Sequence, residues 1–91
     1  MKWLNCKISE GQFTDEFAVQ GKTFNSLKFS LFASKDCIKC KVPPKPGKVV
    51  EGSICVKILD KKDDLVLVEL PQPTFENGQA ITVKAEQIIS D

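Results

Sequence analysis

The sequence predicts one small all-β domain, an antiparallel β-barrel of five to six short strands that extends over residues 1–91. The first observation behind this fold class is the alternation of apolar and polar residues with a period of two in several segments. The second is the spacing of turn-forming residues, which interrupt these segments at intervals of roughly ten residues. The third is composition, because 42% hydrophobic residues and a net charge of +1 are typical of a folded chain.

Three strands are expected in the first part of the chain, residues 1–34. They cover residues 4–8, 16–20 and 27–33. Gly21 marks a bend or bulge, because a residue without Cβ permits positive φ and close backbone approach. A tight turn at residues 25 and 26 leads into the third strand, in which Phe32 is out of phase with its apolar neighbours. We therefore expect the Phe32 ring to be exposed.

The second part, residues 48–91, follows a loop over residues 35–47 that is rich in cysteine, proline and lysine. Its expected elements are a charged turn over residues 60–64 and strands over residues 49–59, 65–70 and 81–83. Pro71 and Pro73 are expected to end the middle strand, because proline has no N–H to donate into a ladder. Residues 85–89 are expected to form one helical turn or to continue as strand.

Residues 78–83, followed by a single turn, are similar to the end of many SH3-like barrels. The expected architecture is therefore an SH3-like or OB-like barrel with at most one short helical turn near the C-terminus. Closure into a barrel removes exposed strand edges. The two strand-rich parts, residues 1–34 and 48–91, show no detectable sequence repeat.

The residue types that are missing disfavour catalysis. There is no histidine, so a histidine-activated serine or cysteine nucleophile cannot be assembled within the chain. There is also no arginine, which removes the bidentate fork that reads guanine edges and phosphates. Neither a tuned pair of carboxylates nor a glycine-rich phosphate loop is present. We expect a protein that is not an enzyme and does not read DNA sequence.

No apolar run approaches the roughly 18 to 20 residues that a membrane-spanning helix needs. The start of the chain is basic, but polar residues interrupt the apolar stretch that a signal peptide requires. We expect no membrane association and a cytoplasmic location.

Four cysteines raise the possibility of a zinc site. Cys37 and Cys40 form one Cys-x-x-Cys knuckle, and Cys6 and Cys55 are the only thiols that could complete four ligands. Strand parity turns Cys6 toward the core and Cys55 toward the other face of its sheet. No cofactor is therefore favoured, and zinc at these four residues remains the alternative.

The same knuckle allows redox chemistry. Lysines near Cys37 and Cys40 favour the reactive thiolate form. However, the prolines that follow prevent the helix that thioredoxin-type sites place after the first cysteine. The remaining alternatives are a reversible disulfide and two reduced thiols in an exposed or half-exposed loop.

A candidate binding surface surrounds the loop. It comprises five lysines and two aromatic residues, namely Lys35, Lys39, Lys41, Lys45, Lys48, Phe32 and Trp3. The lysines favour an anionic partner, and the aromatic rings offer contact or stacking faces. The Trp3 indole either forms part of an exposed interface or covers one end of the barrel.

These observations lead to one functional hypothesis with two alternatives. The first is a non-enzymatic interaction or accessory module that binds a protein partner or associates with itself. One alternative is weak binding of RNA or single-stranded DNA by the lysine-rich loop. The other is a metal or redox site at Cys37 and Cys40.

Overall fold

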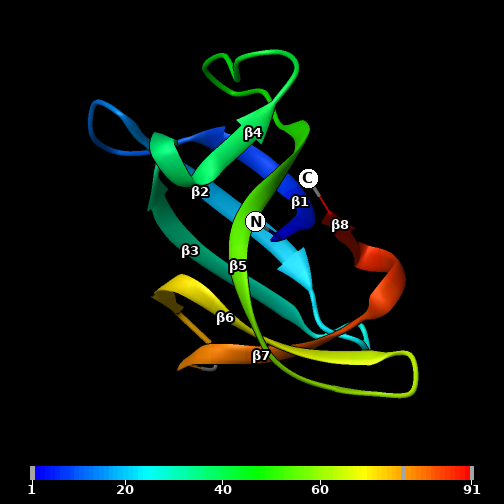
Figure 1. The fold of residues 1–91 in the computed structure, drawn as a ribbon. Helices are drawn as coiled ribbons and strands as arrows, with labels where there is room; N and C mark the ends of the chain where they lie inside the picture. The colour runs from blue at the N-terminus through cyan, green and yellow to red at the C-terminus, as the bar shows by residue number, and fades with distance from the viewer. Residues whose placement is uncertain (1, 77, 91) are drawn as a thin grey trace.

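The structure is a computed structural model that describes residues 2–76 and 78–90, and these form one strongly curled antiparallel sheet (Figure 1). Within the described residues the elements are β1 Lys2–Glu10, β2 Glu16–Lys22, β3 Lys28–Ser34, the 3₁₀ helix η1 Lys35–Cys37, β4 Ile38–Cys40, β5 Val50–Lys62, β6 Leu65–Thr74, β7 Gly78–Lys84, the 3₁₀ helix η2 Ala85–Gln87 and β8 Ile88–Ser90. The predicted fold class, a small antiparallel all-β domain, is confirmed, although the described residues form eight strands instead of the expected five to six. The SH3-like or OB-like assignment remains a prediction.

The sheet has the order β3-β2-β1-β5-β6-β7, with β4 paired to β5 and β8 paired to β1. Strand β5 is long enough to serve two parts of the sheet, because its first residues pair with β1 and its last with β6. Its register with β6 shifts between Ile58 and Asp60, which is where a bulge adds bend and twist to a strand. Figure 1 shows β5 running from the loop at one end of the molecule to the β5–β6 hairpin at the other.

The core follows from the alternation seen in the sequence. Side chains of one parity on each strand point into the curl, and their apolar surface is removed from water. The fully buried large side chains are Leu4, Ile8, Val19, Phe29, Leu31, Ile54, Val68, Leu70 and Val83. Gly21 provides close approach rather than a break in the strand, because a Cβ there would lie 2.4 Å from the Phe29 ring.

Three boundaries predicted from the sequence need correction. The charged turn expected over residues 60–64 is limited to residues 63 and 64, because β5 continues to Lys62. Pro71 and Pro73 do not end their strand, because β6 continues to Thr74. The β6–β7 register shifts between Glu69 and Thr74, so both prolines lie where no ladder hydrogen bond is needed from them. The segment expected as loop over residues 35–47 begins with η1 and β4, and the loop itself covers residues 41–49.

The two halves of the chain repeat one arrangement. The first half is β1 to β4 and the second is β5 to β8; each is a three-stranded meander followed by a 3₁₀ turn and a short strand. From Lys28 to Cys40 every element boundary has an equivalent 50 residues later, between Gly78 and Ser90. The short strand of each half pairs with the first strand of the other half, β4 with β5 and β8 with β1.

Four side chains record this exchange at the centre of the sheet. Ile38 of β4 lies opposite Ile54 of β5, Ile54 opposite Leu4 of β1, and Leu4 opposite Ile88 of β8. In this row Leu4 is equivalent to Ile54, and Ile38 is equivalent to Ile88. The equivalent positions therefore follow in the same order from either end of the row. The repeat therefore has a pseudo-two-fold relation between β1 and β5.

Hydrogen bonds outside the ladders repeat as well. The Lys35 amide donates to the Asp15 carbonyl at 2.9 Å, and the Ala85 amide donates to the Asp64 carbonyl at 2.8 Å. Both bonds fasten a 3₁₀ turn to the first hairpin of its own half. Position 35 is 50 residues before position 85, and Asp15 and Asp64 lie next to equivalent strand starts.

The halves also close on each other. The Phe24 amide, in the loop after β2, donates to the Thr82 carbonyl of β7 at 2.9 Å. The Phe75 amide, in the loop after β6, donates to the Ser30 carbonyl of β3 at 2.9 Å. Each half thus uses its second loop to cover the outermost strand of the other, which limits the open edges of the sheet.

Candidate functional site

Strand β4 places the knuckle residues against β5. Ser34 caps η1, since its Oγ accepts a hydrogen bond from the Asp36 amide at 3.4 Å. The turn delivers Ile38, Lys39 and Cys40 opposite residues 54, 53 and 52 of β5. Beyond Cys40 the chain leaves the sheet in a proline-containing loop, residues 41–49.

A groove of about 1210 Å³ runs beside β4. Its apolar lining comes chiefly from Phe17, Ile38, Val42, Val50 and Ile89. Val42 is 58% exposed, so its side chain is accessible to a bound partner. The volume exceeds the roughly 300 to 1,000 Å³ that is typical of small-molecule pockets, so the groove is large enough for a polypeptide segment. Among the described residues, β4 forms ladder pairs only with β5, and its residues Ile38, Lys39 and Cys40 line this groove.

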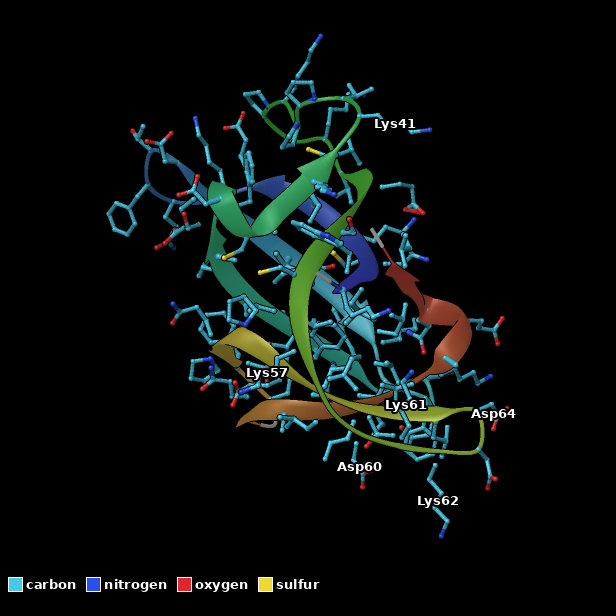
Figure 2. All side chains as sticks on the ribbon, viewed as in Figure 1. Lys41, Lys57, Asp60, Lys61, Lys62 and Asp64 are labelled. Atoms are coloured by element: carbon cyan, nitrogen blue, oxygen red, sulfur yellow. The ribbon has the colours of Figure 1, made fainter. Side chains whose placement is uncertain are left out.

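Lysines dominate the charge of the groove. Lys35, Lys39 and Lys41 line it together with Asp36 and Glu51. Glu51 is ion-paired with Lys7, which offsets its charge, and the adjoining loop adds Lys45 and Lys48, both exposed. Lys35 lies 3.3 Å from an Asp15 carboxylate oxygen. Figure 2 shows Lys41 beside the loop, at the opposite end of the molecule from Lys61 and Lys62.

Trp3 is buried rather than displayed as an interface. Only 6% of its surface is exposed, and the Lys39 ammonium lies 4.3 Å from the centroid of its ring. This distance is within the range of a cation–π interaction. The exposed interface, one of the two alternatives for Trp3, is therefore not observed. The contact also brings two of the predicted site residues together.

Phe32 lies away from the groove lining and packs against another aromatic ring. Its centroid is 5.6 Å from that of Phe75, with the planes at 85°. Phe32 is half-buried rather than exposed as predicted, because its ring packs against Phe75, which is itself 69% exposed. The Glu76 carboxylate holds this segment to β3 by accepting hydrogen bonds from the Ser30 amide and hydroxyl, each at 2.7 Å. Sequence reasoning missed Phe75, because the β6–β7 turn that carries it approaches β3 only through the fold.

The four thiols separate into two pairs that differ from the Cys-x-x-Cys grouping. Cys37, the last residue of η1, adjoins Ile38, and Cys55 adjoins Ile54, the partner of Ile38 on β5. The Cys37 and Cys55 thiols share a hydrogen bond. Cys6 and Cys40 both lie opposite Gly52, on its two sides. Cys6 faces the core while Cys55 lies opposite Trp3 on the other face, as strand parity predicted.

Burial controls the protonation of two thiols. Desolvation, with smaller contributions from Glu51 and Cys40, raises the pKa of Cys6 to about 12. Desolvation and the hydrogen bond to Cys37 raise the pKa of Cys55 to about 11. Both thiols are therefore protonated at neutral pH, whereas metal ligation requires thiolates. Within residues 2–76 and 78–90, no three cysteine or carboxylate side chains gather closely enough to hold a metal ion.

Comparison with protein-family models, with curated proteins and with solved structures finds no match for this chain. None of the helical segments in the described part of the chain has the length and hydropathy needed to cross a lipid bilayer.

Proposed function

We propose that this protein is a non-enzymatic binding module whose partner is an extended segment of another protein, bound along β4. The observation that carries this proposal is the groove beside β4, with its apolar lining, its lysines and the adjacent edge of β4. A partner strand added to that edge would hydrogen-bond through its backbone and alternate its side chains between groove and solvent. The module would thus recognise shape and charge without chemistry on its partner.

Charge defines the kind of segment. Lys35, Lys39 and Lys41 border the groove, and exposed Lys45 and Lys48 extend the positive region along the loop. An acidic segment with apolar residues at alternate positions complements both the lysines and the apolar lining. Because the lysines are solvent-exposed, their contribution is expected mainly in association rate and selectivity, with strong dependence on salt.

Single-stranded nucleic acid is a weaker candidate for the same surface. Stacking platforms need open aromatic faces. Trp3 is buried under Lys39, and Phe32 packs against Phe75. The lysines alone would support only salt-sensitive, sequence-independent contacts.

Selection from a displayed library of random decapeptides tests the proposal. We expect enrichment of acidic sequences with alternating apolar residues, whose binding is then measured by the fluorescence of Trp3, the only tryptophan. Reversal of charge in Lys41→Glu should weaken the selected peptide roughly three- to tenfold, the effect expected of a rim charge. Lys62→Glu is the matched control, since Lys62 is also exposed but lies at the opposite end of the molecule (Figure 2).

Three results would contradict the proposal. One is a selection that enriches no sequence or only basic ones. Another is a selected peptide whose affinity is changed equally by Lys41→Glu and Lys62→Glu. The third is a labelled oligonucleotide that binds more tightly than any selected peptide at physiological salt. Sedimentation across concentration would reveal whether a second copy of the chain occupies the groove instead.

A further inference from the structure

We propose that Cys37 and Cys55 are a redox-modification site at which a small-molecule disulfide, such as oxidised glutathione, converts two thiols into one cross-strand disulfide. This inference is independent of the peptide-binding proposal. It replaces the pairing within the Cys-x-x-Cys knuckle with a pairing between η1 and β5.

Strand register supplies the geometry. Ile38 and Ile54 are directly opposite. Cys37, the last residue of η1, precedes Ile38, and Cys55 follows Ile54, so both cysteines adjoin this pair. A disulfide requires Cα atoms about 4.4 to 6.8 Å apart, a separation that neighbouring antiparallel strands provide. The two side chains already share a hydrogen bond, so the sulfur atoms face each other.

Exposure allows the reaction. Cys37 and Cys55 are both half-buried, so a small disulfide can reach them without unfolding of the domain. By contrast, Cys6 is buried in the core and is withheld from reagents. Access therefore distinguishes the pair from Cys6, whereas Cys40, which is also half-buried, differs from the pair by its position beside Gly52.

The other pairings are disfavoured. Cys6 and Cys40 flank Gly52, so their Cα atoms are separated by two strand spacings, about 9 to 10 Å. That separation exceeds the roughly 7 Å beyond which a disulfide needs backbone movement. Cys37 precedes β4 and faces Cys55, whereas Cys40 ends β4 beside Gly52, so the two knuckle sulfurs have different neighbours.

The reaction proceeds by two thiol–disulfide exchanges. The Cys37 thiolate attacks one sulfur of oxidised glutathione, forming a mixed disulfide and releasing one glutathione thiolate, which takes up a proton. Cys55 then gives its proton to solvent and attacks the Cys37 sulfur, and the second glutathione leaves. The two protein thiols lose two electrons and two protons, and oxidised glutathione gains them as two molecules of glutathione. Cys37 is the first attacker because Cys55 is held protonated at neutral pH.

The product closes a ring from residue 37 to residue 55. This ring contains β4, the loop over residues 41–49 and the first residues of β5. Oxidation therefore fastens the short strand β4 to β5 covalently, beyond its three backbone pairs. We expect amide hydrogen exchange of residues 37–40 to slow at least tenfold on oxidation.

Tryptic mapping of the intact, oxidised protein tests the proposal directly. Cleavage after lysine places each cysteine in a different peptide, with Cys6, Cys37, Cys40 and Cys55 in residues 3–7, 36–39, 40–41 and 49–57. After incubation with a glutathione redox buffer, we expect one cross-link, between the peptides of residues 36–39 and 49–57. Reduction with dithiothreitol should abolish it.

Matched variants separate the alternatives. Cys40→Ser should keep the cross-link, whereas Cys55→Ser should abolish it and leave glutathione attached to Cys37. A cross-link between the peptides of residues 36–39 and 40–41 would overturn the proposal, because it would restore the knuckle as the redox unit. Four free thiols, or stable glutathione adducts without ring closure in the unaltered protein, would overturn it as well.

Discussion

Positions 37 and 87 are equivalent in the two halves of the molecule, but one holds a cysteine and the other a glutamine. The Gln87 side chain accepts a hydrogen bond from the Lys84 amide at 2.8 Å and donates one to the Lys22 carbonyl at 2.9 Å. It thus ties η2 both to its own start and to the end of β2. At the same place in the first half, the contact is a thiol pair between Cys37 and Cys55. One backbone arrangement therefore supports a fixed amide anchor in one half and a chemically alterable anchor in the other.

The halves also divide core volume differently. The pair Val19–Leu31 in the first half is equivalent to the pair Val68–Ile81 in the second. Two residues further along β2 and β6, Gly21 is therefore equivalent to Leu70. Gly21 faces the buried ring of Phe29, whereas the Gln79 amide, at the position equivalent to Phe29, donates to the Leu70 carbonyl at 2.8 Å. The large buried side chain of this pair is Phe29 on β3 in the first half and Leu70 on β6 in the second. The repeat conserves the shape of the backbone while each half fills the core in its own way.

The largest expected effect tests whether the halves contribute equally at the centre of the sheet. Leu4 and Ile54 are equivalent, directly paired and fully buried. Leu4→Ala and Ile54→Ala should each lower the free energy of unfolding by about 2 to 5 kcal/mol, measured by urea denaturation. Because the side chains are in contact, the double variant should depart from additivity. A cost under about 1 kcal/mol for either one alone would show that the halves are not energetically equivalent.

A smaller effect is expected where the halves pack differently. Gly21→Ala would place a Cβ 2.4 Å from the Phe29 ring, which is fully buried and has little room to move. We expect a loss of about 1 to 3 kcal/mol in the free energy of unfolding, as for other overpacked cores. The control is Gly47→Ala in the loop, where no atom lies within 4 Å of the added Cβ and the positive φ of 74° is the only source of strain. Equal costs would mean that backbone conformation, rather than the Phe29 ring, governs position 21.

The third prediction compares the two anchors directly. Gln87→Ala removes two hydrogen bonds at exposed sites and should lower the free energy of unfolding by about 1 kcal/mol. In the reduced protein, Cys37→Ala should cost less than Gln87→Ala, because a thiol is a weak hydrogen-bonding group. Thermal unfolding in the presence of a reductant measures both. The reverse order would show that the reduced thiol pair is the stronger anchor.

The smallest effect concerns acid and the two backbone hydrogen bonds that join the halves, from Phe24 to Thr82 and from Phe75 to Ser30. Hydrogen bonds from Ser30 lower the pKa of Glu76 below its ordinary value of 4.5. A depressed folded-state pKa stabilises the fold above the unfolded value, and this contribution disappears as the pH falls through the folded pKa. Below about pH 4.5 we therefore expect the Phe75 and Ser30 amide resonances to titrate in NMR spectra. The Phe24 amide, which donates to Thr82 without a nearby carboxylate partner, should change little.

A variant provides the check on this last prediction. Glu76→Gln should remove the titration of the Phe75 amide while leaving that of other carboxylates unchanged. Titration of the Phe24 and Phe75 amides together would contradict the prediction, because it would show one acidic transition that affects both hydrogen bonds between the halves.

The period-two pattern was sufficient to predict the fold class and several boundaries. The predicted start of the second strand at Glu16 is confirmed, because the alternation from Phe17 onward is local information. The pairing of β4 with β5 and of β8 with β1 could not be predicted, since both ladders join residues far apart in sequence. The structural repeat could not be predicted from the sequence, because the halves share apolar positions, such as Leu4 and Ile54, rather than identical residues.

The candidate site was predicted only in part. Lys35, Lys39 and Lys41 do border one groove, but Trp3 is buried beneath Lys39. Sequence spacing suggested that Cys37 and Cys40 act together, whereas strand register assigns them different neighbours. Register is set by long-range pairing, so a spacing motif alone could not reveal the contact with Cys55.

The pairing of β1 with β8 has a consequence for synthesis on the ribosome. Residues 2–4 receive their β8 partners only when residues 88–90 have emerged. At about 5 to 20 residues per second, that interval is roughly 4 to 17 s. During it, one edge of the first strand offers unsatisfied backbone groups to any neighbouring nascent chain. Strand β8 therefore protects β1 from intermolecular pairing once both have been made.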